Sequence, residues 1–200
     1  RIYGNMYYEK PAFVREKGSM EFLVPLIEEL KFYNGFGGFS RTGEEYVIVR
    51  GRTLPAPWIN CIATENFGFI ISETGGGSVW NINSRENRLT PWSCDIVRDA
   101  PNEVIYIRDD GSGRYFSATP LPCGGQECVV RHGFGYSLFE QQEGVLQSRM
   151  TVFAPLEAPV KFSLLQLTNT GPETVSLSLF YYFRPVLGNK AERMADSVIS

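Results

Sequence analysis

Apolar residues alternate with polar ones along most of the chain after residue 32, a period of two that is typical of β-strands. Residues 45–50 and 104–108 are clear cases, because both are rich in β-branched and aromatic residues. Residues 58–63 predict another short strand. In residues 67–72 the apolar side chains fall on alternate positions, which predicts a half-buried strand, and Gly68 within it suggests a bulge.

Turn signals divide the C-terminal half into closely spaced segments. Residues 109–113, Asp-Asp-Gly-Ser-Gly, predict a hairpin between 104–108 and a return strand at 114–117. Further strands are expected at 133–139, 145–153, 161–168 and 174–183. The last two alternate on either side of an Asn-Thr-Gly-Pro turn, which predicts an antiparallel meander. So many strands at near-regular spacing predict an all-β fold, a large antiparallel β-sandwich.

The N-terminal region follows a different pattern. Residues 21–30 are compatible with a short helix that has Pro25 near its start, or with an extended linker. We therefore divide the chain into an N-terminal extension or linker at residues 1–32 and a β-sandwich domain at residues 33–200. The chain shows no closing signal near Ser200, so we expect this sandwich to be incomplete at its C-terminus and part of a larger protein.

Composition narrows the possible partners. The formal net charge of −3 does not favour nucleic acid, and no apolar run approaches the ~20 residues of a membrane span. The spacing of the four cysteines fits no zinc site, and we expect no metal. Cys123 and Cys128 could form a disulfide, but free thiols in a reducing cytoplasm are favoured. No signal peptide is visible, and a cytoplasmic location is expected.

A polar and aromatic cluster follows a triple glycine and offers candidate chemistry. It comprises Arg85, Glu86, Asn87, Arg88 and Trp92. Guanidinium groups donate paired hydrogen bonds to vicinal hydroxyls, and an indole covers the apolar face of a pyranose. The five residues are therefore candidate substrate-binding residues. An equally weighted alternative is an ion-pair and turn network that holds a loop against the sandwich.

Other candidates are weaker. Trp58 and Trp80 admit a sugar platform, but Trp80 follows an apolar strand and is favoured as core. The single histidine, His132, could act as a general base, although a lone histidine is usually structural. Asp109-Asp110 is favoured as a turn rather than a glycosidase carboxylate pair. Gly75–Gly77 lacks the Lys-Ser/Thr of a phosphate-binding loop.

Several ordered motifs resemble a known family. FGFIISETGGGSVW, NSRENRLTPW and RHGFGYSLFE are similar to the N-terminal domain of glycoside hydrolase family 94, the inverting glycoside phosphorylases once classed as glycosyltransferase family 36. The resemblance runs from about residue 35 to about residue 188. NGFGGFSRTGEEYVI and PAPWINCIA look closest to the β-1,2-glucan branch, which holds 1,2-β-oligoglucan phosphorylase and the phosphorylase-like part of cyclic β-1,2-glucan synthase.

The resemblance carries expectations for fold and activity. It implies a supersandwich-like domain whose catalytic (α/α)6 barrel lies downstream in the same protein. The full protein would cleave β-1,2-linked glucooligosaccharides with inorganic phosphate as co-substrate and release α-glucose 1-phosphate, without a cofactor. The catalytic aspartate and the phosphate site would lie in the barrel, so no catalytic residue is expected here. The sandwich would shape the substrate side and form a domain interface, with a homodimer possible.

Two alternatives stay open. The family includes relatives that act on other disaccharides, such as cellobiose or chitobiose. A non-catalytic carbohydrate-binding β-sandwich module is the rival of a different class, and it predicts a domain that folds and binds glucan alone.

Overall fold

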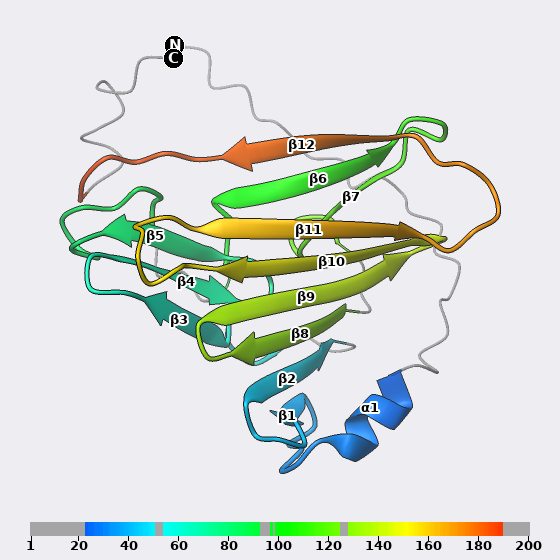
Figure 1. Cartoon of the computed structure of the whole chain (residues 1–200), viewed down its shortest axis with the longest axis horizontal. Helices are drawn as coiled ribbons and strands as arrows, with labels where there is room; N and C mark the ends of the chain where they lie inside the picture. The colour runs from blue at the N-terminus through cyan, green and yellow to red at the C-terminus, as the bar shows by residue number, and fades with distance from the viewer. Residues whose placement is uncertain (1–22, 51–53, 93–96, 98, 125–127, 190–200) are drawn as a thin grey trace.

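The structure is a computed structural model that describes residues 23–50, 54–92, 97, 99–124 and 128–189; these contain one short helix and twelve strands (Figure 1). The helix is α1 (Leu23–Glu29). The strands are β1 (Gly37–Phe39), β2 (Glu45–Arg50), β3 (Ile59–Ala63), β4 (Phe67–Ser72), β5 (Gly77–Asn81), β6 (Glu103–Asp109), β7 (Tyr115–Ser117), β8 (Cys128–Gly133), β9 (Tyr136–Glu143), β10 (Leu146–Phe153), β11 (Phe162–Asn169) and β12 (Leu177–Phe183).

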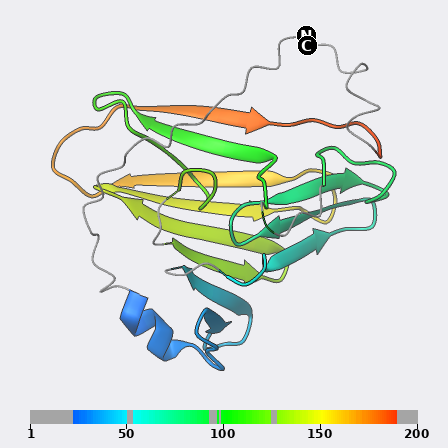
Figure 2. The same ribbon diagram turned by 180° about the vertical axis from the view of Figure 1, so that it is seen from behind.

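The strands form three antiparallel sheets. The largest has the order β1-β2-β8-β9-β10-β11, and two smaller sheets have the orders β12-β6-β7 and β3-β4-β5. Figures 1 and 2 show the large sheet from its two sides, with α1 beside the β1–β2 end and the β6 and β12 strands of a smaller sheet beyond β11 at the other end. The all-β, antiparallel fold predicted from the alternating pattern is confirmed.

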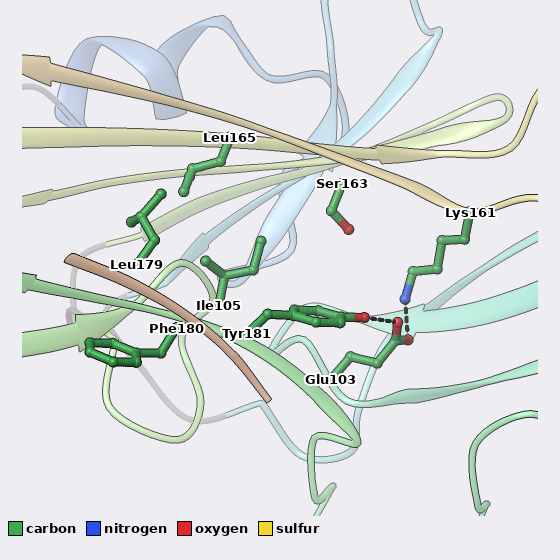
Figure 3. Close-up of a pocket in the computed structure, with 8 residues that line it drawn as sticks. All are labelled: Glu103, Ile105, Lys161, Ser163, Leu165, Leu179, Phe180 and Tyr181. Carbon is green, nitrogen blue, oxygen red and sulfur yellow. Dashed lines mark hydrogen bonds and ion pairs between the residues drawn. The ribbon is translucent and has the colours of Figure 1, made fainter. Parts of the chain in front are cut away.

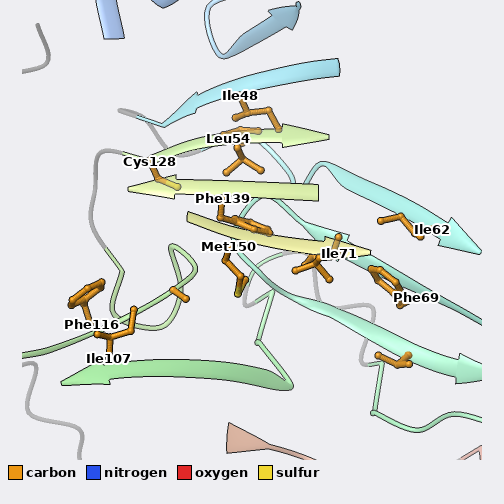
Figure 4. Close-up of a cluster of buried hydrophobic side chains, with 14 of the residues drawn as sticks. Ile48, Leu54, Ile62, Phe69, Ile71, Ile107, Phe116, Cys128, Phe139 and Met150 are labelled. Carbon is orange, nitrogen blue, oxygen red and sulfur yellow. The ribbon is translucent and has the colours of Figure 1, made fainter. Parts of the chain in front are cut away.

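One hydrophobic core joins the three sheets (Figure 4). The large sheet contributes Ile48 and Phe139, the sheet of β4 contributes Phe69, and the sheet of β6 contributes Ile107; all four side chains are fully buried. Complete burial of such a side chain stabilises the fold by about 1.5–3 kcal/mol. The sandwich is therefore held by the inward face of the large sheet packing on both smaller sheets.

The other face of the large sheet is covered locally by α1. Val47 and Val49 alternate with Ile48 along β2 and point away from the main core, as strand geometry requires. With Val129 they form a second buried cluster, against which Leu26 and Ile27 of the helix pack. Of the two alternatives for residues 21–30, the helix is therefore confirmed.

The prediction that β4 is half-buried was wrong, as was the bulge at Gly68. All six residues of β4 are buried, because the strand is central in its sheet and lies inside the sandwich. Gly68 pairs in unbroken register with Ala63 on one side and Trp80 on the other. A Cβ at Gly68 would lie 2.5 Å from the Trp80 ring, so the glycine provides space for a half-buried indole.

Two further predictions need correction. Residues 133–139 are not one strand: Gly133 ends β8, Phe134 and Gly135 form the turn, and Tyr136 begins β9. Gly135 has φ +82°, a conformation that glycine adopts without strain. The strands at 161–168 and 174–183 do not pair with each other. β11 pairs with β10, whereas β12 pairs with β6, so the chain crosses between sheets after residue 169.

The predicted hairpin at residues 109–113 is confirmed. β6 and β7 pair with Arg108 opposite Tyr115. The carboxylate of Asp109 accepts hydrogen bonds from the Gly111 N–H (2.9 Å) and the Ser112 hydroxyl (2.5 Å), which lowers the pKa of Asp109. Asp109 therefore has the turn role that the sequence favoured.

Candidate functional site

The predicted sugar-binding residues lie together in the loop after β5. Its first turn is organised by Asn83, whose side-chain oxygen accepts from the N–H groups of Arg85 and Glu86, both at 2.9 Å. Arg88 pairs with Trp80 on one side and with Gly188 on the other as isolated β-bridges. The loop is therefore tied both to the β3-β4-β5 sheet and to the segment that follows β12.

Two charged groups of this loop bind each other. Arg85 and Glu86 form an ion pair of 3.1 Å, with side chains 85% and 55% exposed. Glu86 also accepts a hydrogen bond of 2.9 Å from the amide of Asn189. Asn87 takes part through its backbone, with its carbonyl accepting from the Asn81 N–H at 3.0 Å. Such exposed pairs contribute about 0–1 kcal/mol to stability, so the network links the loop only weakly to the segment after β12.

Arg88 and Trp92 come together at the end of the loop. The Arg88 guanidinium donates to the Ser84 carbonyl at 2.9 Å and lies 6.0 Å from the centre of the Trp92 ring. Trp92 is 43% exposed. The arginine thus covers one side of the indole, at the outer limit of a cation–π contact. Chemically, this pair can offer an apolar ring and fixed donors to a sugar, and a binding role for the five residues stays a prediction.

A cleft of about 460 Å³ lies where β6, β11 and β12 approach one another (Figure 3). Within it the Lys161 ammonium donates to Glu103 at 2.5 Å, and the Tyr181 hydroxyl donates to the other carboxylate oxygen at 2.7 Å. Burial and the neighbouring carboxylate raise the pKa of Tyr181 well above its usual value. These polar groups therefore satisfy one another. Glu103 is the one carboxylate among the residues that line the cleft, so the cleft does not hold the carboxylate pair of a glycosidase.

The strands that border this cleft expose a row of large apolar side chains. They are Phe162, Leu164, Leu179, Phe180, Tyr181, Tyr182 and Phe183, each 43–64% exposed. β11 and β12 are also edge strands of their sheets, so one side of each backbone has no partner strand among the described residues. Long apolar edges of this kind are typical of surfaces covered by another part of a protein.

His132 lies at the end of β8 and faces a second, smaller cleft of about 330 Å³. Its Nε2 lies 3.2 Å from the Trp58 carbonyl and its Nδ1 lies 2.9 Å from the Ser137 hydroxyl. Burial lowers the pKa of His132 to about 4. A neutral ring with both nitrogens engaged fits the structural role that the sequence favoured.

Trp58 also lines this second cleft, with Asn34, Tyr46 and Ile59. Sequence reasoning considered Trp58 and His132 one at a time and missed that they meet. The residues come from four separate segments, and only the pairing of β2 with β8 and the seating of β3 bring them together. No local pattern in the sequence could have revealed the cleft.

The remaining chemical candidates have structural explanations. The Gly75–Gly77 turn packs against Asp99, whose carboxylate accepts from the Ser72 and Thr74 hydroxyls, and a carboxylate there opposes phosphate binding. Cys61, Cys123 and Cys128 are thiols rather than disulfides. In the described part of the chain no group of His, Cys, Asp and Glu could hold a metal ion. Over the same residues, no helix has the length and apolar character to cross a membrane.

Comparison with known proteins places this architecture in a family. The family described as "Glycosyl hydrolase 94, supersandwich domain" matches residues 44–199, which is more than three quarters of the chain. The chain belongs to this family. The match covers all strands from β2 to β12 and both clefts, apart from Asn34.

Curated relatives include a synthase and several phosphorylases. The chain is 36% identical to cyclic β-(1,2)-glucan synthase NdvB of Rhizobium meliloti (strain 1021), over 96% of this chain and 7% of that protein. It is 31% identical to N,N′-diacetylchitobiose phosphorylase of Vibrio proteolyticus, over 74% of this chain and 19% of that protein. A 3-O-β-D-glucopyranosyl-β-D-glucuronide phosphorylase of Paenibacillus borealis is 28% identical, over 83% and 21%. The chain thus spans about a fifth or less of these relatives.

Proposed function

We propose that this chain is the N-terminal part of an inverting glycoside phosphorylase that cleaves β-1,2-linked glucooligosaccharides with inorganic phosphate and releases α-glucose 1-phosphate. The observation that carries the substrate is the 36% identity to a cyclic β-(1,2)-glucan synthase, which extends over 96% of the chain. The phosphorolysis is supported by the relatives named as phosphorylases, two of which match over 74% and 83% of the chain. No metal or organic cofactor is part of the proposal.

Within that protein we assign the sandwich two tasks. The first is to form an interface with the remainder of the same protein through the apolar side chains of β11 and β12. Leu164 and Tyr181 are 64% and 60% exposed, and large apolar side chains gathered on one surface are typical of an interface. The second is to shape the substrate side, to which Trp92 and Arg88 contribute in this proposal. The catalytic acid then belongs to the downstream barrel, and a homodimer is compatible with the same surface.

A phosphorylase for another disaccharide is the second candidate. The chitobiose phosphorylases of Vibrio proteolyticus and Vibrio furnissii, both 31% identical, favour it. Their matches cover 74% of this chain, whereas the glucan synthase match covers 96%, and this difference ranks the β-1,2 substrate first. A free-standing carbohydrate-binding module is disfavoured by the exposed apolar strands, which would make a separate domain prone to association.

The test is an assay of the full-length parent protein with inorganic phosphate and a panel of β-glucosides. Release of glucose 1-phosphate from β-1,2-glucooligosaccharides, and not from cellobiose or N,N′-diacetylchitobiose, is the expected result. Activity on one of the latter only would keep the family chemistry and reject the substrate. If no β-glucoside supports phosphate-dependent release, the enzyme proposal fails and a binding module becomes the better account.

A further inference from the structure

The cleft beside His132 has the composition of a sugar site, and neither the family match nor the predicted site residues assign it a role. Asn34 comes from the loop before β1, Tyr46 from β2, Trp58 and Ile59 from the start of β3, and His132 from the end of β8. Its volume of about 330 Å³ lies at the lower end of the roughly 300–1,000 Å³ usual for small-molecule sites. It is therefore large enough for a small ligand.

The floor of this cleft is fixed by hydrogen bonds that cross between sheets. A carbonyl oxygen can only accept, so Nε2 of His132 donates to Trp58 and Nδ1 accepts from the Ser137 hydroxyl. The amide of Asn60 donates to the carbonyls of Gly133 and Tyr136 at 3.0 and 2.8 Å. These bonds hold the start of β3 against the β8–β9 hairpin, so the cleft is set by the fold rather than by loose side chains.

Aromatic rings form the walls. Tyr46 and Trp58 lie 5.7 Å apart at 69°, and Phe36 supports the indole edge-on at 6.0 Å. Phe39 supports Tyr46 at 5.1 Å in the same way. Rings held at near right angles present both a flat face and an edge to a ligand. A pyranose has matching surfaces, because its C–H groups form an apolar face and its hydroxyls lie at the rim.

Two hydrogen-bond donors remain available at the rim. The Tyr46 hydroxyl accepts from the Asn34 amide at 3.1 Å, and its own proton has no acceptor among the described residues. The indole N–H of Trp58 also donates to no described group. Among the described residues, Ser148 Oγ is the one buried side-chain polar atom without a hydrogen-bond partner. The Trp58 N–H has no partner either and is not in that buried group, so it reaches solvent. With His132 neutral, none of the five lining residues carries a charge.

We propose that this cleft binds a glucosyl unit of the β-glucan substrate, an inference that rests on the proposed function. The uncharged lining selects a neutral sugar over a phosphate or an acidic saccharide. The ring of Trp58 or Tyr46 supports the apolar face of the pyranose, and the free hydroxyl and indole donors bind its hydroxyl groups. Tyr46 is then a substrate-binding residue that the sequence did not indicate, and Trp58, a weaker sugar-platform candidate in the sequence, binds beside it.

The experiment measures hydrogen–deuterium exchange of the full-length protein over a series of β-1,2-glucooligosaccharide concentrations. Sugar is expected to slow exchange in peptides covering residues 34–48 and 55–63. Tyr46→Phe keeps the ring and removes one donor, so the sugar concentration for half-maximal protection should rise about fivefold. Trp58→Phe should raise it further. Tyr115→Phe is the matched control, because Tyr115 likewise packs edge-on against an aromatic ring but lies outside the cleft, and it should leave the value unchanged.

Absence of sugar-dependent protection in these peptides would overturn the inference, as would equal half-maximal concentrations in Tyr46→Phe and the unmodified protein. Glucose 1-phosphate release, assayed on the same preparations, separates this failure from that of the proposed function. Release without protection at residues 34–48 and 55–63 rejects the cleft alone. Protection without release, shifted by Tyr46→Phe, rejects the phosphorylase and supports the cleft as a sugar site.

Discussion

Gly68→Ala tests how closely β4 and β5, which are neighbours in the β3-β4-β5 sheet, are packed. An added Cβ would lie 2.5 Å from one ring carbon of Trp80 and 2.7 Å from another, where ordinary contact begins at 3.4 Å. The half-buried indole of Trp80 on β5 must therefore move by about 1 Å away from β4, whose residues are all buried. Overpacking of this kind costs about 1–3 kcal/mol, and the lower entropy of the unfolded alanine chain offsets about 0.4–1 kcal/mol. We expect a net loss of about 1–2 kcal/mol.

Native-state hydrogen exchange of the β4 and β5 amides measures this loss locally, so it applies to a large protein that does not unfold in one step. A loss of 1–2 kcal/mol corresponds to exchange about 5–30-fold faster. Gly111→Ala is the matched control, because Gly111 lies in an exposed turn with one side-chain oxygen 3.3 Å from the new Cβ, and it should change exchange little. Exchange in β4 and β5 within twofold of the unmodified protein would refute the packing argument.

Three further predictions concern the titrating and exposed groups. The pKa of His132 is lower in the folded protein (about 4) than its usual 6.5, so protonation of His132 favours unfolding. The contribution of neutral His132 to stability should be complete above pH 6.5 and should be lost as the pH falls to 4. His132→Gln should remove this part of the pH–stability profile. Lys161→Met leaves the carboxylate of Glu103 without its cation and should destabilise β6 by about 2 kcal/mol in hydrogen exchange, whereas adding Glu103→Gln should restore part of the loss. Trp92→Ala in the full-length protein should raise KM for the glucan severalfold with little change in kcat, and an unchanged KM, as expected for the exposed control Arg41→Ala, would reject the platform role.

Local signals in the sequence were sufficient for many elements of this fold. The turn at residues 109–113 was predictable because Asp109 and its glycines encode their own hydrogen bonds. The partner of β12 was not, because alternation gives a strand and its faces without saying which strand lies beside it. Residues 177–183 pair with residues 103–109 within one of the smaller sheets, and no short-range pattern distinguishes that from a hairpin with β11.

The two candidate sites differ in the same way, because one is visible in local sequence and the other is not. Arg85 to Trp92 were recognisable because they are neighbours in sequence, and the structure keeps them in one loop. Asn34, Tyr46, Trp58 and His132 span about a hundred residues and meet only after three strands are placed. The burial that lowers the pKa of His132 likewise arises only in the folded protein. Such sites require tertiary structure, because their chemistry is distributed over the chain.

We propose that this sandwich belongs to a phosphorylase of β-1,2-linked glucans. The most direct measurement is phosphate-dependent release of α-glucose 1-phosphate by the full-length parent protein, with β-1,2-glucooligosaccharide as the substrate and cellobiose and N,N′-diacetylchitobiose as comparisons. We expect release from the β-1,2 substrate that requires phosphate and is absent with the other two sugars. Release from cellobiose or N,N′-diacetylchitobiose alone, or no release from any of the three, would contradict it.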